Sequence, residues 1–151
     1  MVRRLTPDHQ RVTDFLFFVV CSLVIIFATS RRGVFLLAPP YDVTAYLVLF
    51  EKNSKFSKPT SVAVSYAMVI LSTLVLHSLL GNTAISLTLN VLLVAAFISA
   101  TGFSHPPALA LTIFSYLTAD TLGFSLTSSF VLIVIFCFMM VDRKLTNSTH
   151  R

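Results

Sequence analysis

The sequence predicts an all-α polytopic membrane protein, with four full transmembrane helices and two further segments that prolines interrupt. Of its 151 residues, 56% are hydrophobic and only 11% are charged, and the mean hydropathy is +0.86. Globular proteins average about 45–50% apolar and about 25% charged residues. Disordered chains combine low hydrophobicity with high net charge. The composition therefore excludes both a soluble globular domain and a disordered chain.

Four stretches are apolar enough to cross the membrane, because a helix needs about 20 residues to span about 30 Å of hydrocarbon. They cover residues 14–30, 59–80, 83–101 and 121–141. The first stretch follows Arg3, Arg4 and Arg11, which is also the pattern of a cleaved secretory leader. Since the rest of the chain is equally apolar, we interpret this stretch as an uncleaved first span.

Two more apolar stretches contain prolines and are either crossings or re-entrant segments. Residues 33–50 hold Pro39-Pro40, and residues 103–119 begin with His105-Pro106-Pro107. The pairs are 67 residues apart, and the same offset maps Thr60-Ser61 onto Thr127-Ser128. Three segments per half would give an inverted two-fold internal repeat, as in many transporters. The alternative is that the two pairs coincide by chance.

The Lys and Arg residues favour six crossings, because cytoplasmic loops carry an excess of these residues. With four crossings the two sides hold six and five basic residues, which gives almost no bias. With six crossings Lys52, Lys55 and Lys58 join the basic residues of both tails, and the division becomes nine to two. We therefore expect cytoplasmic tails at residues 1–13 and 142–151, and a transmembrane domain at 14–141. The plasma membrane is the default location.

The proline pairs predict helix starts at membrane depth. Proline is favoured in the first turn of a helix, whose free N–H groups and partial positive charge attract anions. Two such starts facing one cavity would bind a small inorganic anion. Pro39, Pro40, Pro106 and Pro107 are therefore candidate substrate-binding residues. The alternative is that they only begin short tilted helices.

Three polar side chains at membrane depth are further candidates, since such groups are costly there. Asp42 is a candidate for proton coupling, or a first-turn residue that the helix dipole stabilises. His105 is a candidate anion ligand and proton relay, because histidine titrates near about pH 6.5; otherwise it binds a neighbouring carbonyl group. Asn90 is a candidate substrate-binding residue, because a carboxamide in mid-span needs partners. We expect no catalytic residue, no metal and no cofactor.

The run Ser104-His105-Pro106-Pro107-Ala108 in a small multispan chain resembles the HPP family of integral membrane proteins, which is named after this motif. The resemblance extends to the runs Leu-Leu-Ala-Pro-Pro-Tyr at 36–41, Thr-Ala-Tyr-Leu-Val-Leu-Phe at 44–50 and Ser-Lys-Pro at 57–59, and covers about residues 15 to 141. Family members are small polytopic membrane proteins, and some are implicated in nitrite transport. The resemblance therefore implies transport of a small anion.

Three positions depart from the pattern of many family members. A Gln-Pro-Arg-Asn-like run is replaced here by Lys58-Pro59-Thr60-Ser61, so its arginine is missing. Asp42 and Leu109 stand where many members have a small residue, often glycine. The missing arginine and the added carboxylate weaken the implication of nitrite in particular.

These observations predict a channel or transporter for a small, nitrite-like anion. It would lie in the lipid bilayer as a homo-oligomer and would not bind nucleic acid, because the basic residues flank the spans. The alternative is a non-catalytic accessory or structural subunit of a larger membrane complex. We expect no enzymatic activity, because the sequence has neither His-Glu-x-x-His nor Gly-x-Ser-x-Gly and its acidic residues are scattered.

Overall fold

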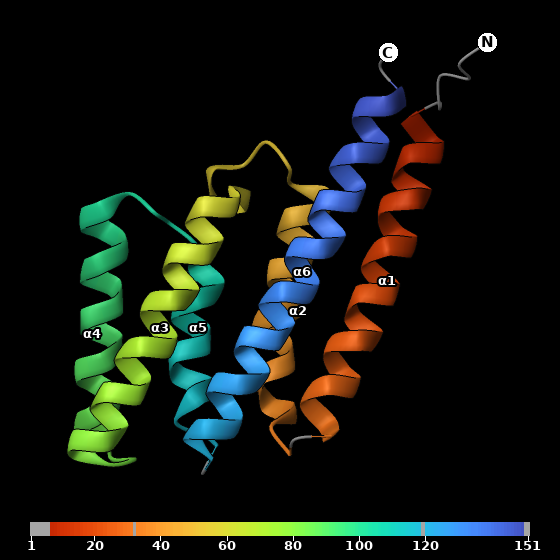
Figure 1. Ribbon diagram of the computed structural model, residues 1–151. Coiled ribbons are helices and arrows are strands. Elements are labelled where there is room, and N and C mark those ends of the chain that lie inside the picture. The colour runs from red at the N-terminus through yellow and green to blue at the C-terminus, as the bar shows by residue number, and fades with distance from the viewer. Residues whose placement is uncertain (1–6, 32, 119, 150–151) are drawn as a thin grey trace.

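A computed structural model describes residues 7–31, 33–118 and 120–149, and the described residues form helices and no strands (Figure 1). The α-helices are α1 (Pro7–Arg31), α2 (Ala38–Phe50), α3 (Pro59–Leu80), α4 (Ala84–Thr101), α5 (Pro106–Ser115) and α6 (Thr121–Thr149). Two 3-10 turns, η1 (Phe35–Leu37) and η2 (Lys55–Ser57), precede α2 and α3. The all-helical class predicted from composition is confirmed.

Four of these helices are long and apolar enough to cross a membrane, as the sequence predicted. Their apolar parts are Arg11–Arg31, Pro59–Leu80, Ala84–Thr101 and Thr121–Lys144. α1 and α6 extend beyond the predicted spans into residues 7–13 and 142–149. Residues 142–149 contain no glycine or proline that would end α6, and the proline in residues 7–13 is Pro7, the first residue of α1, where proline is favoured.

The two proline-containing segments both pass from one end of the bundle to the other. Successive helices run in alternating directions, so that the segment with α2 connects the end of α1 to the start of α3 (Figure 1). The segment with α5 likewise connects the end of α4 to the start of α6. α5 has 10 residues and spans only about 15 Å at about 1.5 Å per residue. Non-helical residues before and after it complete the passage.

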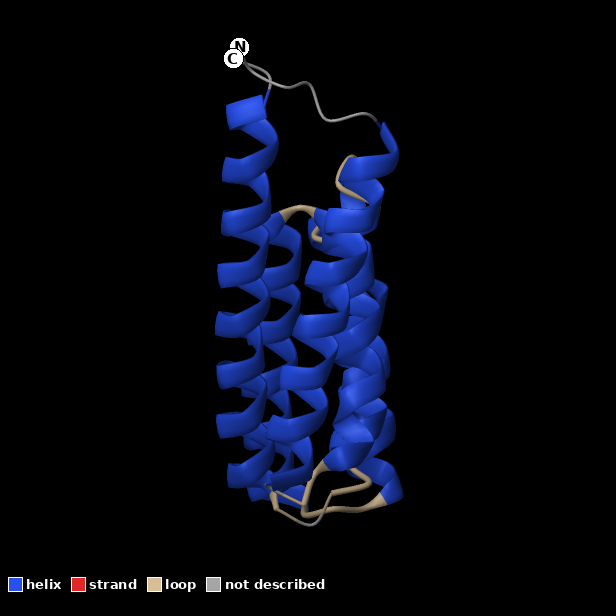
Figure 2. Cartoon of the chain, turned by 90° about the vertical axis from the view of Figure 1, so that its right-hand side faces the viewer, coloured by secondary structure: helices blue, strands red, loops and turns tan. Residues whose placement is uncertain are grey.

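The start of α1, the end of α6 and η2 lie at the same end of the bundle, which we call the tail end (Figures 1 and 2). Lys52 connects them, because its Nζ lies 3.0 Å from Asp14 of α1 and 2.7 Å from Asp142 of α6. This is the grouping that the basic residues predicted. The opposite end holds Arg31 and the turn between α3 and α4.

The packing of the helices has the symmetry of an inverted repeat. α1 packs on α2 and α6, and α4 packs correspondingly on α5 and α3. The contact of α2 with α6 corresponds to that of α5 with α3, while α2–α5 and α3–α6 are contacts between equivalent helices. Pro39 and Pro106 are exposed, whereas Pro40 and Pro107 are buried. The two halves thus match at the proline pairs and in their helix contacts.

This topology predicts opposite labelling of two introduced cysteines. In a background with Cys21→Ala and Cys137→Ala, Lys55→Cys at the tail end and Leu80→Cys at the end of α3 should react from opposite sides of a sealed vesicle. The reason is that α3 alone connects the two positions and crosses the bundle once. A membrane-impermeant maleimide measures this. Labelling of both cysteines from one side would contradict the crossing of the membrane by α3.

Candidate functional site

His105 lies at the start of α5 and is fully buried. Its Nδ1 is 2.7 Å from the carbonyl oxygen of Phe56 in η2, and its Nε2 is 2.9 Å from Oγ1 of Thr44 in α2. A carbonyl oxygen only accepts hydrogen bonds, so Nδ1–H is the donor, and Nε2 of the neutral ring accepts from Thr44. The imidazole therefore joins α2, η2 and α5.

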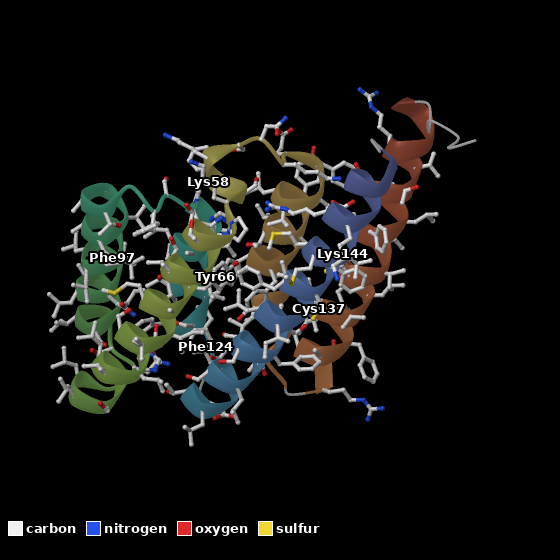
Figure 3. All side chains as sticks on the ribbon, turned by 45° about the horizontal axis from the view of Figure 1, so that its top comes forward. Lys58, Tyr66, Phe97, Phe124, Cys137 and Lys144 are labelled. Carbon is white, nitrogen blue, oxygen red and sulfur yellow. The ribbon has the colours of Figure 1, made fainter. Side chains whose placement is uncertain are left out.

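Thr44 and Tyr66 extend this arrangement, and we refer to His105, Thr44 and Tyr66 as the His105 network. The Thr44 hydroxyl contacts the Tyr66 hydroxyl, and it also lies 2.9 Å from the carbonyl oxygen of Pro40. The Tyr66 hydroxyl donates to the same Pro40 oxygen at 3.3 Å. Tyr66 lies in the middle of the bundle on α3 (Figure 3), with its ring centroid 5.4 Å from that of His105.

The network can take up a proton without leaving a buried group unpaired. In the neutral state the Thr44 hydroxyl can donate to Nε2 of His105. When Nε2 is protonated it donates to Thr44 Oγ1, and the Thr44 hydroxyl can turn to the Pro40 oxygen, which is within reach at 2.9 Å. Unpaired buried polar groups cost about 1–3 kcal/mol. Because the Pro40 oxygen is a second acceptor for the Thr44 hydroxyl, it lowers the free-energy cost of protonating His105.

A second polar cluster lies between α3, α4 and α5 around Asn90, which is fully buried. Ser115 donates to the Thr112 carbonyl oxygen at 2.8 Å, so its hydroxyl oxygen is left to accept from Thr73 at 3.3 Å. Thr73 in turn accepts from Nδ2 of Asn90 at 3.0 Å. This order leaves Oδ1 of Asn90 as an acceptor with no partner among the described residues. We call this set the Asn90 cluster.

A third group of polar side chains lies near the end opposite the tail end. His77 Nδ1 is 2.8 Å from Thr121 Oγ1, and the His77 ring packs edge-on against Tyr116 with centroids 4.2 Å apart. The Tyr116 hydroxyl is 2.8 Å from Ser86 Oγ. Together the three groups place polar atoms along α3 and α5 at several depths of the bundle.

Sequence reasoning selected His105 and Asn90 but missed Thr44, Tyr66 and Thr73. A signal was present on α3, where Tyr66, Thr73 and His77 are spaced by seven and four residues and so share one helix face. The two predicted residues lie in separate parts of the bundle, and buried Val69 separates Tyr66 from Thr73 along α3.

Asp42 lies apart from the His105 network. It is half-buried and faces α1, next to Ser22 and close to Cys21. Tyr41 and Thr44 on the same helix face the interior, where Tyr41 donates to Ser128 of α6. Asp42 and His105 are therefore on different sides of α2, and the structure does not bring the two proton-coupling candidates together.

The two proline-led helix starts do not converge on one cavity. α2 and α5 are antiparallel neighbours, so their starts lie toward opposite ends of the bundle (Figure 1). Proline also has no N–H, and the Ala108 N–H already donates to the His105 carbonyl oxygen at 3.0 Å. The expected joint anion cradle at Pro39, Pro40, Pro106 and Pro107 is thus not formed. The prolines instead set where each helix begins.

Comparison with known proteins gives one match. The family model for the HPP transmembrane region matches residues 7–150. No curated protein and no solved structure matches the chain. The matched region contains every residue of the His105 network and of the Asn90 cluster.

Proposed function

The chain belongs to the HPP family of transmembrane proteins, and from its buried polar groups we propose that it is a channel or transporter for a small, nitrite-like anion. The observation that carries this proposal is the placement of the His105 network and the Asn90 cluster within an otherwise apolar bundle. Polar groups at membrane depth are costly and mark substrate or proton paths by default. Inverted halves are a recurrent architecture of transporters.

In the proposed mechanism the anion passes along α3 and α5, and His105 supplies or receives the accompanying proton. The second acceptor of Thr44 supports a relay role for His105. The free Oδ1 of Asn90 accepts a hydrogen bond from the conjugate acid of the anion or from a water molecule that accompanies the anion. Pro106 and Pro107 position His105, and Pro40 contributes its carbonyl oxygen. Asp42, on the α1 side, is a separate candidate for proton coupling.

We further propose that the tail end is cytoplasmic and that the membrane is the plasma membrane. Arg11, Lys52, Lys55 and Lys58 lie at or near the tail end, and Arg143 lies at the end of the apolar part of α6. Cytoplasmic segments are enriched in such residues. A homo-oligomer belongs to the proposal, because six helices of which two are short enclose little space.

The proposal predicts anion flux that depends on Thr44. Purified protein in proteoliposomes should transport one of nitrite, nitrate, formate, bicarbonate or chloride. Thr44→Val should lower this flux about tenfold, because it removes a hydrogen bond of roughly 1–1.5 kcal/mol from the path. Thr88→Val is the matched control: Thr88 also bonds the carbonyl four residues earlier, but it is exposed and lies outside the network.

His105→Gln separates proton coupling from structure, because a glutamine amide can donate and accept like the neutral ring but does not titrate near neutral pH. In a proton-coupled transporter this variant should retain its fold and lose acceleration of anion uptake by an inward pH gradient. Absence of flux for all five anions above empty liposomes would contradict the proposal and favour an accessory subunit.

A further inference from the structure

A groove with a volume of about 400 Å³ opens between α1 and α6 at the end opposite the tail end. Its walls are apolar and come from Val24 and Phe27 of α1 and from Leu126 and Phe130 of α6. These residues lie within the apolar parts of both helices. α1 and α6 come from different halves of the inverted repeat, so the groove lies on the junction of the halves.

One cation lies at the mouth of this groove. Arg31 is the last residue of α1, and its guanidinium lies 5.0 Å from the centroid of the Phe27 ring. Among the described residues no carboxylate forms an ion pair with Arg31. The guanidinium is thus held against the groove wall with its donors available, and its planar fork suits a phosphate group.

A second polar group lies deeper in the same groove. Thr127 lines it, is only 4% exposed, and its Oγ1 has no hydrogen-bond partner among the described residues. Thr127 is six residues into α6, or about 9 Å from the helix start at about 1.5 Å per residue. A buried hydroxyl without a partner is uncommon in folded proteins, and Thr127 is one of the residues that line the groove.

We propose that this groove binds one anionic glycerophospholipid. The phosphate pairs with Arg31, an ester carbonyl oxygen of the lipid accepts from the Thr127 hydroxyl, and an acyl chain lies along Phe27, Leu126 and Phe130. A free phosphate ion would leave the apolar walls uncovered. The residues that line the groove include no Asp or Glu, so a choline or ethanolamine ammonium group would find no partner. The site therefore selects a lipid with net negative charge, of the phosphatidylglycerol type.

The test uses tryptophan fluorescence, since the chain has no tryptophan of its own. Phe130→Trp places a reporter in the groove at a side chain that is 51% exposed. Leu92→Trp on α4 is the matched control: Leu92 is 60% exposed and lies nearly as many residues from the start of α4 as Phe130 does from the start of α6. Each variant is reconstituted in phosphatidylcholine vesicles that contain increasing brominated phosphatidylglycerol or brominated phosphatidylcholine.

We expect brominated phosphatidylglycerol to quench the Phe130→Trp reporter with about fivefold higher apparent affinity than brominated phosphatidylcholine. The choline ammonium of phosphatidylcholine competes with Arg31 for the phosphate, and this competition corresponds to about one exposed ion pair. Arg31→Ala should abolish this preference. The Leu92→Trp reporter should show none. Equal quenching of the Phe130→Trp reporter by both lipids would overturn the proposal. Weak quenching by both would also overturn it, and would indicate that a second copy of the chain covers the groove.

Native mass spectrometry provides a second measurement on chains that retain Phe130. The unsubstituted protein should retain one phosphatidylglycerol in preference to phosphatidylcholine, and Arg31→Ala and Thr127→Val should each lower the retained fraction. Arg143→Ala, which removes an exposed cation from α6 near the tail end, should leave the retained fraction unchanged. Loss of the adduct on addition of inorganic phosphate would show a simple anion site and would overturn the lipid assignment.

Discussion

Replacing His105 by alanine should destabilise the bundle by about 3–5 kcal/mol, the range for large-to-small substitutions in a core. Two effects contribute to this loss. The fully buried imidazole leaves a cavity, and the carbonyl oxygen of Phe56 loses its donor at 2.7 Å. The Thr44 hydroxyl, which loses its acceptor on His105, can turn to the Pro40 oxygen at 2.9 Å, so it adds little to the loss. Unfolding in mixed micelles with increasing denaturing detergent measures the difference in free energy.

The same substitution should loosen η2, because His105 is the side chain that bonds the Phe56 carbonyl oxygen. Trypsin should then cleave after Lys55 faster than in the unsubstituted protein under native conditions, whereas the Lys58–Pro59 bond is resistant to trypsin in both proteins. His105→Gln is the control and should stay within about 1 kcal/mol of the original stability, because its amide can replace both hydrogen bonds. Equal stability of the alanine variant and the unsubstituted protein would refute the structural role assigned to the ring.

The helices and their directions could be predicted from the sequence because both depend on local patterns. Apolar runs of about 20 residues identify spans, and the lysines of the η2 region predicted that this loop lies with the tails. The proline pairs also predicted the inverted halves. The exact ends of α1 and α6 could not be predicted in the same way. Their terminal turns are polar, so the apolar run is shorter than the helix in both cases.

The site was predictable only in part, because hydrogen-bond partners depend on how helices pack. His105 and Asn90 were identifiable as polar residues at depth. Thr44 was not, since a threonine in a membrane helix usually bonds its own backbone, as Thr44 also does with Pro40. Its contact with His105 requires α2 and α5 to lie side by side, which no local pattern states.

The expected shared anion cradle is not formed, and the first reason is the inverted repeat itself. Three segments per half make equivalent helices antiparallel, so the starts of α2 and α5 point in opposite directions. The second reason is chemical, since two successive prolines remove two of the N–H groups that a helix start offers to an anion. The motif is better explained as a device that places His105, and the carbonyl oxygen of Pro40, inside the bundle.

Replacing Lys52 by methionine should cost about 3 kcal/mol, because breaking a buried ion pair leaves charge behind. Lys52 holds Asp14 at 3.0 Å and Asp142 at 2.7 Å, and the side chains of these carboxylates are only 11% and 4% exposed. The variant would leave two negative groups close together at the junction of α1, α6 and the loop before η2. Lys55→Met is the matched control: Lys55 is exposed and lies over the Phe56 ring, a contact of about 0.5–1 kcal/mol.

Two further measurements distinguish charge from lost packing. Asp14→Asn with Asp142→Asn, added to Lys52→Met, should recover most of the stability, because the like charges are gone. Partial burial lowers the pKa of Lys52, but the hydrogen bonds that its ammonium group donates to Asp142 and Asp14 outweigh this effect and raise the pKa above its ordinary value. A raised pKa in the folded state means that its stabilisation is complete below about pH 10.4, the unfolded value, and is lost as the pH rises through the folded value. The unsubstituted protein should therefore lose stability as the pH rises above about 10.4, and Lys52→Met should lack that loss. If both proteins followed the same curve, the salt bridges would contribute nothing to holding the two halves together at the tail end.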